Sequence, residues 1–180
     1  LYGFGQFQND GLNRKNSYLR LQQTNTEIAI PFYFSSKGYG IVWNNPSLTI
    51  VNGKKRNIPF HSNGTMNRFW ATFQSAEDGD YIFILELGEW DSDVVFKLNN
   101  ERIFAYDFYV QPRVLTVKTR LEGNQSYDIE MEGCVQCLSY RSPALGNETA
   151  LWSEAADFLE YYLIYGPEPD SIIRGYRELT

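Results

Sequence analysis

The chain alternates apolar and polar residues most regularly near its N-terminal end. Apolar side chains occupy every second position from Ile28 to Phe34, and YGIVW (39–43) forms a second apolar run. Ser35 to Gly38 separates the two runs, and Asn44 to Ser47, with a proline, follows the second. Because side chains alternate faces along a strand, the pattern predicts strands at 28–34, 39–43 and 48–51, joined as a β-meander. We expect this meander to pair with strands near the C-terminal end.

The middle of the chain contains short apolar segments separated by turns rich in Asn, Asp, Glu and Gly. The predicted strands are RFWATF (68–73), GDYIFIL (79–85), DVVFKL (93–98), RVLTVKTRL (113–121) and YDIEM (127–131). Short strands at such regular spacing are typical of a β-sandwich. Tyr81 to Leu85 is apolar on both faces, which predicts a central strand.

Two of these strands carry opposite charges on their polar faces. Lys118 and Arg120 alternate with apolar residues in the first, and Asp128 and Glu130 alternate with apolar residues in the second. If the two strands form a hairpin, the basic residues lie across from the acidic ones, and each pair adds a few tenths of a kcal/mol.

Both ends of the chain contribute further elements. Leu1 to Lys15 is rich in Gly and Asn and predicts a loop, and Tyr18 to Gln22 alternates as a short strand. Ala150 to Phe158 and Tyr161 to Tyr165 predict strands. Apolar residues then recur at helical spacing from Ile172 onward, which predicts a C-terminal helix of about 10 residues, with Asp170 as its N-cap. The predicted fold class is all-β, with two β-sandwich modules, one inserted in the other, and a short C-terminal α-helix.

Composition narrows the class of protein. Hydrophobic residues make up 43% of the 180 residues and aromatic residues 16%, which favours strands. A net charge of −6 and a pI near 4.8 argue against a nucleic-acid partner, which needs a basic surface. No apolar run approaches the roughly 20 residues of a membrane span. Leu1 starts without a basic region or cleavage site, so either a signal was removed or the sequence begins inside a longer protein.

Several single residues and short motifs could in principle bind a metal or act in catalysis, but each has a simpler structural explanation. Cys134 and Cys137 form one CxxC, but a zinc site needs four ligands and the single histidine, His61, is distant in sequence. We expect two structural thiols, with a disulfide or metal as alternatives. Glu27 has no convincing second carboxyl for glycoside hydrolysis and is expected to hold a loop. Asn52-Gly53 predicts a tight hairpin.

The two ends of the chain resemble a known family. YGFGQFQNDGLN (2–13), NTEIAIPF (25–32) and SSKGYGIVWNNPS (35–47) resemble the N-terminal β-sandwich of glycoside hydrolase family 31, closest to its α-xylosidases and α-glucosidases. YYLIYGPEPDSIIRGYRELT (161–180) resembles the segment through which that family enters its catalytic (β/α)8 barrel. The resemblance implies a retaining α-glycosidase whose catalytic aspartates lie in the barrel, so no catalytic residue is expected in this chain.

The same resemblance implies a sugar subsite near the N-terminus. The loop around Gln6, Phe7 and Gln8 would help to wall that subsite, since the apolar face of a sugar ring stacks on an exposed aromatic ring. The alternative is that Phe7 anchors a surface loop by packing internally, as aromatic side chains usually do.

Residues 58–141 resemble a second family, the protective-antigen-type (PA-14) β-sandwich module. An aromatic strand, AEDGDYIF, an acidic turn and an Asn hairpin follow one another from Phe69 to Asn100. Members of that module often bind carbohydrate, some through calcium held by adjacent aspartates. Asp91-Ser92-Asp93 does not reproduce that pair, so we expect no metal and no cofactor. Trp90 is the predicted sugar platform, with a partly buried turn aromatic as the alternative.

Together these predictions give one interpretation of the chain. Residues 1–55 and 146–180 form a discontinuous family 31 sandwich segment, and 56–145 form the inserted PA-14-type module. The chain is then an accessory, substrate-shaping part of a secreted or periplasmic α-glycosidase, an α-xylosidase on xyloglucan-type oligosaccharides, and is inactive alone. The alternatives are a non-catalytic carbohydrate-binding or adhesion module and a structural insert for oligomer contacts. The expected partner is an oligosaccharide, and self-association of the full-length enzyme stays open.

Overall fold

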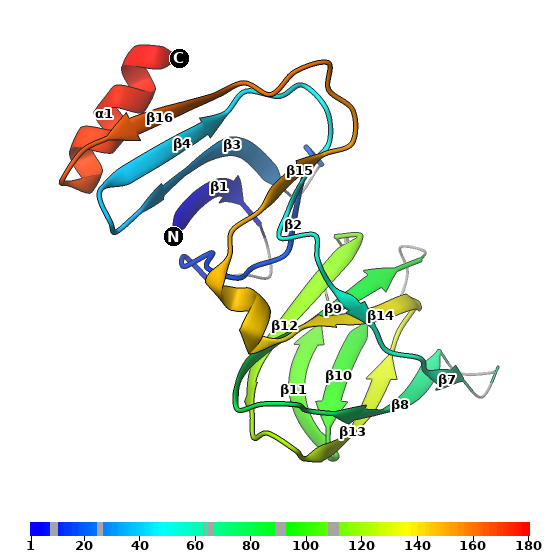
Figure 1. Cartoon of the computed structure of the whole chain (residues 1–180). Helices are drawn as coiled ribbons and strands as arrows, with labels where there is room; N and C mark the ends of the chain where they lie inside the picture. Colours follow the sequence, from blue (N-terminus) through cyan, green and yellow to red (C-terminus); the bar gives the residue numbers. More distant parts are fainter. Residues whose placement is uncertain (8–10, 25–26, 63, 65–66, 89–92, 108–111) are drawn as a thin grey trace. The chain divides into compact units, whose positions relative to one another are not determined.

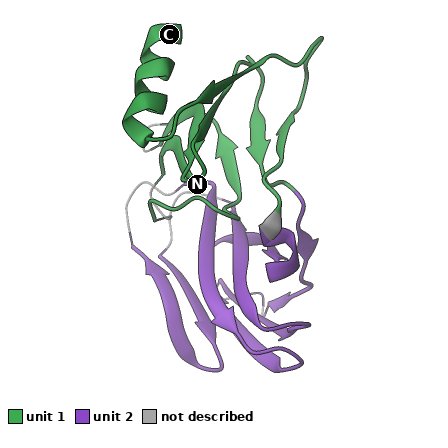
Figure 2. Ribbon diagram, turned by 60° about the vertical axis from the view of Figure 1, so that its left-hand side comes forward, with its two compact units in different colours: residues 1–53, 148–180 green, residues 54–147 purple. Residues whose placement is uncertain are grey.

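The computed structural model describes the chain except for residues 8–10, 25–26, 63, 65–66, 89–92 and 108–111 (Figure 1). The chain divides into two compact units, coloured separately in Figure 2. Unit 1 contains Leu1–Gly53 and Glu148–Thr180, and unit 2 contains Lys54–Asn147. Both units are built from antiparallel β-sheets, so the all-β fold class is confirmed.

The first sheet of unit 1 joins the two ends of the sequence. Its order is β1-β3-β4-β16, with β1 at Tyr2–Gln6, β3 at Ile28–Ser35, β4 at Tyr39–Trp43 and β16 at Tyr161–Tyr165. Ile41 of β4 pairs with Tyr33 on one side and with Leu163 of β16 on the other. The predicted pairing between the N-terminal strands and the C-terminal end is therefore confirmed (Figure 1).

The third strand of the predicted meander belongs to a different sheet, so the meander was wrong. β5 (Thr49–Val51) pairs with β2 (Leu19–Leu21) and β15 (Leu151–Ser153) rather than with β4. The physical reason is burial. Val51 is fully buried in a cluster with Phe4, Phe7, Leu19 and Tyr33, and crossing to the second sheet places it there.

The Gly-rich start of the chain forms strand β1 instead of the predicted loop. Its register shifts between Gly3 and Gly5, which is a β-bulge. Both glycines have positive φ, and between them Phe4 at φ 68° is fully buried with its ring centroid 4.9 Å from that of Tyr33. The bulge turns an aromatic ring into the core.

The C-terminal helix α1 (Pro169–Leu179) packs on this sheet. It begins two residues earlier than predicted, because Glu168 rather than Asp170 is the N-cap, Pro169 is the first helical residue and Asp170 lies in the first turn. Ile172 is 1% exposed, and the Tyr176 ring stacks on Phe32 at 4.2 Å between centroids.

Unit 2 is a sandwich of two sheets around one core. One sheet has the order β11-β10-β13-β8-β7, with β7 at His61–Ser62, β8 at Arg68–Gln74, β10 at Val94–Leu98, β11 at Glu101–Tyr106 and β13 at Ser126–Glu132. The other has the order β12-β9-β14-β6, with β6 at Arg56–Asn57, β9 at Gly79–Leu87, β12 at Val114–Leu121 and β14 at Val135–Arg141. A 3-10 turn at Pro143–Asn147 follows.

The central strand was predicted correctly and the hairpin was not. β9 lies between β12 and β14, and Tyr81 to Leu85 are all buried. β12 pairs with β9, whereas β13 pairs with β8 and β10 in the opposite sheet. Both strands point their apolar side chains into the same core from opposite sides, so they cannot also be neighbours in one sheet. Lys118 therefore meets Asp80 at 3.0 Å.

Two smaller predictions were also settled. Asn52-Gly53 makes no hairpin, because β5 and the next strand, β6, lie in different units. After β13, Gly133 at φ 115° turns the chain into β14 in the other sheet, next to the two cysteines. Neither Cys134 nor Cys137 forms a disulfide bond.

Candidate functional site

The outer face of the five-stranded sheet of unit 2 presents an exposed tryptophan. In β8 the alternation buries Ala71 and Phe73, which leaves Trp70 on the opposite face. Its side chain is 40% exposed although it lies in the middle of a strand. Within unit 2, the cross-strand partners of Trp70 are His61 on β7 and Glu130 on β13.

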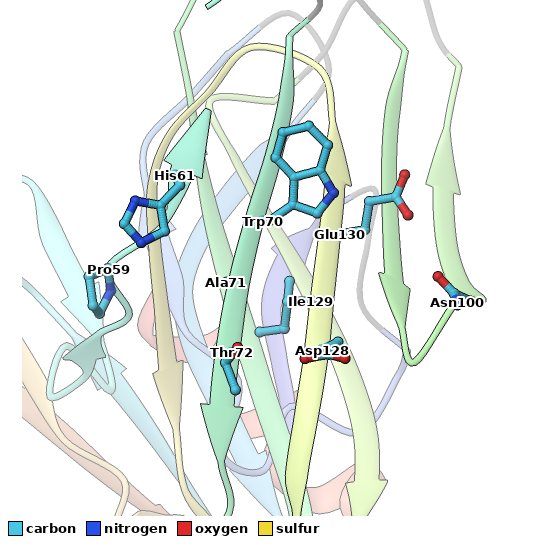
Figure 3. A pocket seen from close by; sticks show the side chains of 9 residues that line it. All are labelled: Pro59, His61, Trp70, Ala71, Thr72, Asn100, Asp128, Ile129 and Glu130. Atoms are coloured by element: carbon cyan, nitrogen blue, oxygen red, sulfur yellow. The ribbon is translucent and has the colours of Figure 1, made fainter. Parts of the chain in front are cut away.

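A hollow of about 480 Å³ surrounds this tryptophan (Figure 3). Figure 3 shows the indole of Trp70 between the side chains of His61 and Glu130. The hollow is lined by β8 (Trp70, Ala71, Thr72), by β13 (Asp128, Ile129, Glu130), and by Pro59, His61 and Asn100. An aromatic ring beside carboxylates, a hydroxyl, an imidazole and an amide can stack on a ligand and also bind its hydroxyl groups.

A lysine holds the acidic groups at this face. Lys97 Nζ lies 3.1 Å from Glu130 Oε1 and 3.2 Å from Glu132 Oε1, and Arg68 approaches Glu132 at 3.8 Å. The hydrogen bond to Glu130, followed by that to Glu132, raises the pKa of Lys97 above its usual value. Lys97 therefore stays protonated at neutral pH and fixes the position of the Glu130 carboxylate.

A second hollow, of about 500 Å³, lies within unit 1. Its walls include Pro31, Trp43, Asn44, Pro46, Phe158 and Glu160. The Trp43 indole donates hydrogen bonds to Thr49 Oγ1 at 3.1 Å and to Ser153 Oγ at 3.2 Å, and only 8% of it is exposed. This ring is therefore fixed between the two sheets and offers little stacking surface. Phe158, 72% exposed, is the accessible aromatic ring of this hollow.

The side-chain chemistry of this second hollow is amide and carboxylate. Asn44 donates a side-chain hydrogen bond to Glu160, and Tyr162 Oη donates to the same carboxylate at 2.8 Å. That hydrogen bond raises the pKa of Tyr162. The Glu160 carboxylate therefore accepts hydrogen bonds from two side chains, which suits a structural role in holding the loop rather than binding a ligand.

The residues predicted from the sequence lie in different environments. Gln6 is exposed at the end of β1. Phe7 is 7% exposed and packs in the unit 1 core, with the Arg14 guanidinium 5.5 Å from its ring centroid. Trp90 lies outside the described residues. The sugar-binding roles of Gln6, Phe7 and Trp90 stay predictions.

Sequence reasoning missed Trp70, although its signal is present in the sequence. In RFWATF, Ala71 and Phe73 are buried and Phe69 is half-buried, so the large aromatic Trp70 falls on the polar face. A tryptophan on the polar side of an alternating strand indicates a surface role rather than a core role.

The described part of the chain lacks both a metal-binding cluster and a membrane-spanning helix. Those residues contain no group of three or more His, Cys, Asp or Glu side chains placed to hold a metal ion. No helix formed by them has the length and apolar character needed to cross a membrane.

Comparisons with known proteins point to one family. No protein-family model matches the chain. A protein of Pseudescherichia vulneris described as an uncharacterized family 31 glucosidase is 38% identical over 73 residues, which are 40% of this chain and 14% of that protein. An α-xylosidase of Saccharolobus solfataricus is 39% identical over 104 residues, 53% of this chain and 12% of that protein.

A solved structure shares the fold. The crystal structure of a family 31 α-xylosidase from Xanthomonas citri has a TM-score of 0.66 and 22% identity, and the match covers 98% of this chain and 26% of that one. The chain thus spans 12 to 14% of the length of the two curated relatives it matches. The sequence matches and the shared fold agree, and the chain resembles the N-terminal β-sandwich region of glycoside hydrolase family 31.

Proposed function

We propose that this chain is an accessory, substrate-shaping part of a retaining α-glycosidase that removes terminal α-linked sugars. An α-xylosidase acting on xyloglucan-type oligosaccharides is the specific form of the proposal. In it, unit 1 is the family 31 sandwich, unit 2 is an inserted PA-14-type module, and the catalytic barrel belongs to another part of the protein. A secreted or periplasmic location is part of the same proposal, because oligosaccharides cut from polymers are met outside the cytoplasm.

One observation carries the proposal. The two segments that resemble family 31 are separated in sequence by all of unit 2, yet β4 and β16 pair in register from Trp43 with Tyr161 to Tyr39 with Tyr165. A sandwich interrupted by a complete second unit is the organisation expected when a module is inserted into a host domain. The relatives named α-xylosidase and glucosidase support the choice of reaction.

The carboxylates of the Trp70 hollow support a binding role for this chain. Retaining glycosidases place two carboxyl groups about 5 to 5.5 Å apart, one of them a general acid that must carry a proton. Glu130 Oε1 lies 3.1 Å from Lys97 Nζ, so this carboxylate is engaged in an ion pair with a neighbouring strand. We therefore assign no catalytic residue in this chain.

A second candidate function is a carbohydrate-binding module without hydrolysis. The exposed indole of Trp70 on the outer face of the sheet favours it. Under this alternative the chain binds glycan and no catalytic barrel follows in the gene.

The test compares this chain with the protein encoded by the complete gene. We expect the gene to encode a barrel with two aspartates, and the full-length protein to hydrolyse p-nitrophenyl α-xyloside while the 180-residue chain does not. Hydrolysis by the chain alone, or its absence from a folded full-length protein, contradicts the proposal. A gene without a barrel favours the binding-module alternative.

A further inference from the structure

We propose that Trp70 and the polar side chains around it form a binding site for a sugar ring of a neutral oligosaccharide. The site lies on the outer face of the sheet in unit 2, on strands β7, β8 and β13. The inference rests on the proposed function for the choice of oligosaccharide. The geometry that carries it belongs to unit 2 alone.

The first step is the exposure of the indole. The core of unit 2 already contains Phe73, Tyr81, Phe83 and Phe96, whose rings pack against one another at 5.1 to 5.4 Å between centroids. Trp70 points away from that core and is 40% exposed. Leaving a large apolar ring in water contributes little to folding, whereas the ring offers a flat surface on which the C–H face of a pyranose can stack.

The second step is the ring of polar groups around the indole. His61 and Glu130 flank Trp70 on the two neighbouring strands, and Thr72 and Asp128 form the next pair on the same face, two residues further along. Together they provide hydroxyl, imidazole and carboxylate groups, which can donate to or accept from sugar hydroxyls. Because these residues come from adjacent strands of one sheet, their positions are fixed before any ligand arrives.

The third step is the turn at the edge of the hollow. Asn99 and Asn100 both have positive φ, 48° and 65°, and join β10 to β11. The Asn99 side chain accepts a hydrogen bond from the Asp128 backbone N–H at 2.9 Å, and the Asn99 N–H donates to Asp128 O at 2.8 Å. These two bonds fasten the turn to β13, and Asn100 forms part of the wall.

The fourth step is charge, which selects the class of sugar. Lys97 is bound by Glu130 and Glu132, and Arg68 approaches Glu132, so these two cations already face carboxylates. Asp128 adds a further negative charge to the lining. An acidic sugar or a phosphate would meet repulsion here, whereas an uncharged, hydroxyl-rich ligand would not. The hollow of about 480 Å³ is within the size range of small-ligand sites.

The test measures binding by the 180-residue chain, using isothermal titration calorimetry and the indole N–H resonances in NMR spectra. The probes are xyloglucan heptasaccharide, which is neutral, and tetragalacturonate, which is acidic. We expect the neutral probe to bind and to shift the Trp70 indole resonance, with the acidic probe at least about 10-fold weaker. Trp70→Ala should weaken binding of the neutral probe about 10-fold or more, which is the loss of one stacking contact.

Matched variants separate loss of the site from loss of the fold. Trp152 on β15 of unit 1 is 54% exposed, so Trp152→Ala removes an indole that is more accessible than that of Trp70 and should leave binding unchanged. Trp70→Phe retains a ring and should recover most of the affinity lost in Trp70→Ala. If Trp70→Ala does not fold, the Trp70→Phe affinity and the resonance shift in the unaltered chain decide the question.

Three outcomes overturn the site: no binding of the neutral probe, equal binding by Trp70→Ala, or a shift confined to indoles other than Trp70. The readout involves no hydrolysis. Trp70-dependent binding together with an inactive full-length protein would therefore contradict the proposed function and leave this site intact.

Discussion

At the scale of single residues, Asn52 shows how one side chain closes unit 1 across a long gap in the sequence. It is 1% exposed at φ 55°; its Nδ2 donates to Ser17 O at 2.7 Å, and its Oδ1 accepts from Ala150 N at 3.0 Å. Asparagine suits this position because it tolerates the left-handed conformation and supplies both a donor and an acceptor.

We expect Asn52→Ala to lower the free energy of unfolding of unit 1 by about 2–4 kcal/mol, through two lost buried hydrogen bonds and left-handed strain. Asn124→Ala is the control, because Asn124 has φ 56° but an exposed side chain, so only the strain of about 1–2 kcal/mol applies. Amide hydrogen exchange measured in each unit gives both values. Equal losses at the two positions would show that the side-chain bonds of Asn52 contribute nothing.

The aromatic residues show what the sequence can and cannot predict at this scale. Alternation in RFWATF is enough to place Trp70 on a surface. Identifying it as part of a binding site also requires the hollow around it, to which His61 and Asn100 contribute from other segments of the sequence. Phe7 lies in a Gly- and Asn-rich stretch that predicts exposure, yet it is 7% exposed because Leu19 and Val51 pack around it. Burial of a loop residue depends on contacts that local patterns do not contain.

At the scale of elements, alternation predicted where strands lie but not their partners. β4 and β16 have the predicted bounds, and Tyr81 to Leu85 lie in a central strand. β5 and β13 were assigned to the wrong neighbours, since both cross to a second sheet. A strand with one apolar face can bury that face either in a hairpin with the preceding strand or in the opposite sheet of a sandwich. Its own sequence does not distinguish the two, because the outcome depends on the other residues of each sheet.

Helix α1 gives a test of packing at this scale. Ile172 is 1% exposed, and a Cβ built at Gly40 of β4 would lie 2.5 Å from Ile172 Cγ2, so helix and strand are in direct contact. We expect Ile172→Ala to destabilise the docked helix by about 2–4 kcal/mol. Leu179→Ala, at a residue 44% exposed on the same helix, should cost under about 1 kcal/mol. Hydrogen exchange of the α1 and β4 amides measures both; comparable protection in the two variants contradicts the docking.

At the scale of the whole molecule, each unit has its own core. The buried cluster that includes Phe83, Phe96 and Met131 lies entirely in unit 2, and the cluster that includes Phe4, Tyr33 and Val51 lies entirely in unit 1. The ends of unit 2 are fastened within it. The buried Arg141 donates from Nη1 to Lys54 O at 2.6 Å and from Nη2 to Leu145 O at 3.0 Å. A unit that has its own hydrophobic core, and whose two ends are hydrogen-bonded to it, is expected to fold alone.

We therefore expect residues 54–147 to fold as an isolated protein, with a thermal midpoint within about 5 °C of the unit 2 transition in the full chain, because the buried cluster around Phe83 and Phe96 is kept whole. The isolated unit should bind xyloglucan heptasaccharide within about twofold of the full-chain affinity, since the whole Trp70 hollow is retained. The Arg141→Lys variant tests the hydrogen bonds that fasten the ends of unit 2. A lysine ammonium cannot replace the two hydrogen bonds that the guanidinium group donates, so the thermal midpoint of unit 2 should fall. Calorimetry of the three proteins measures these midpoints. If 54–147 stays unfolded while the full chain melts in one step, the two units form a single cooperative structure, and an inserted module is the wrong description of unit 2.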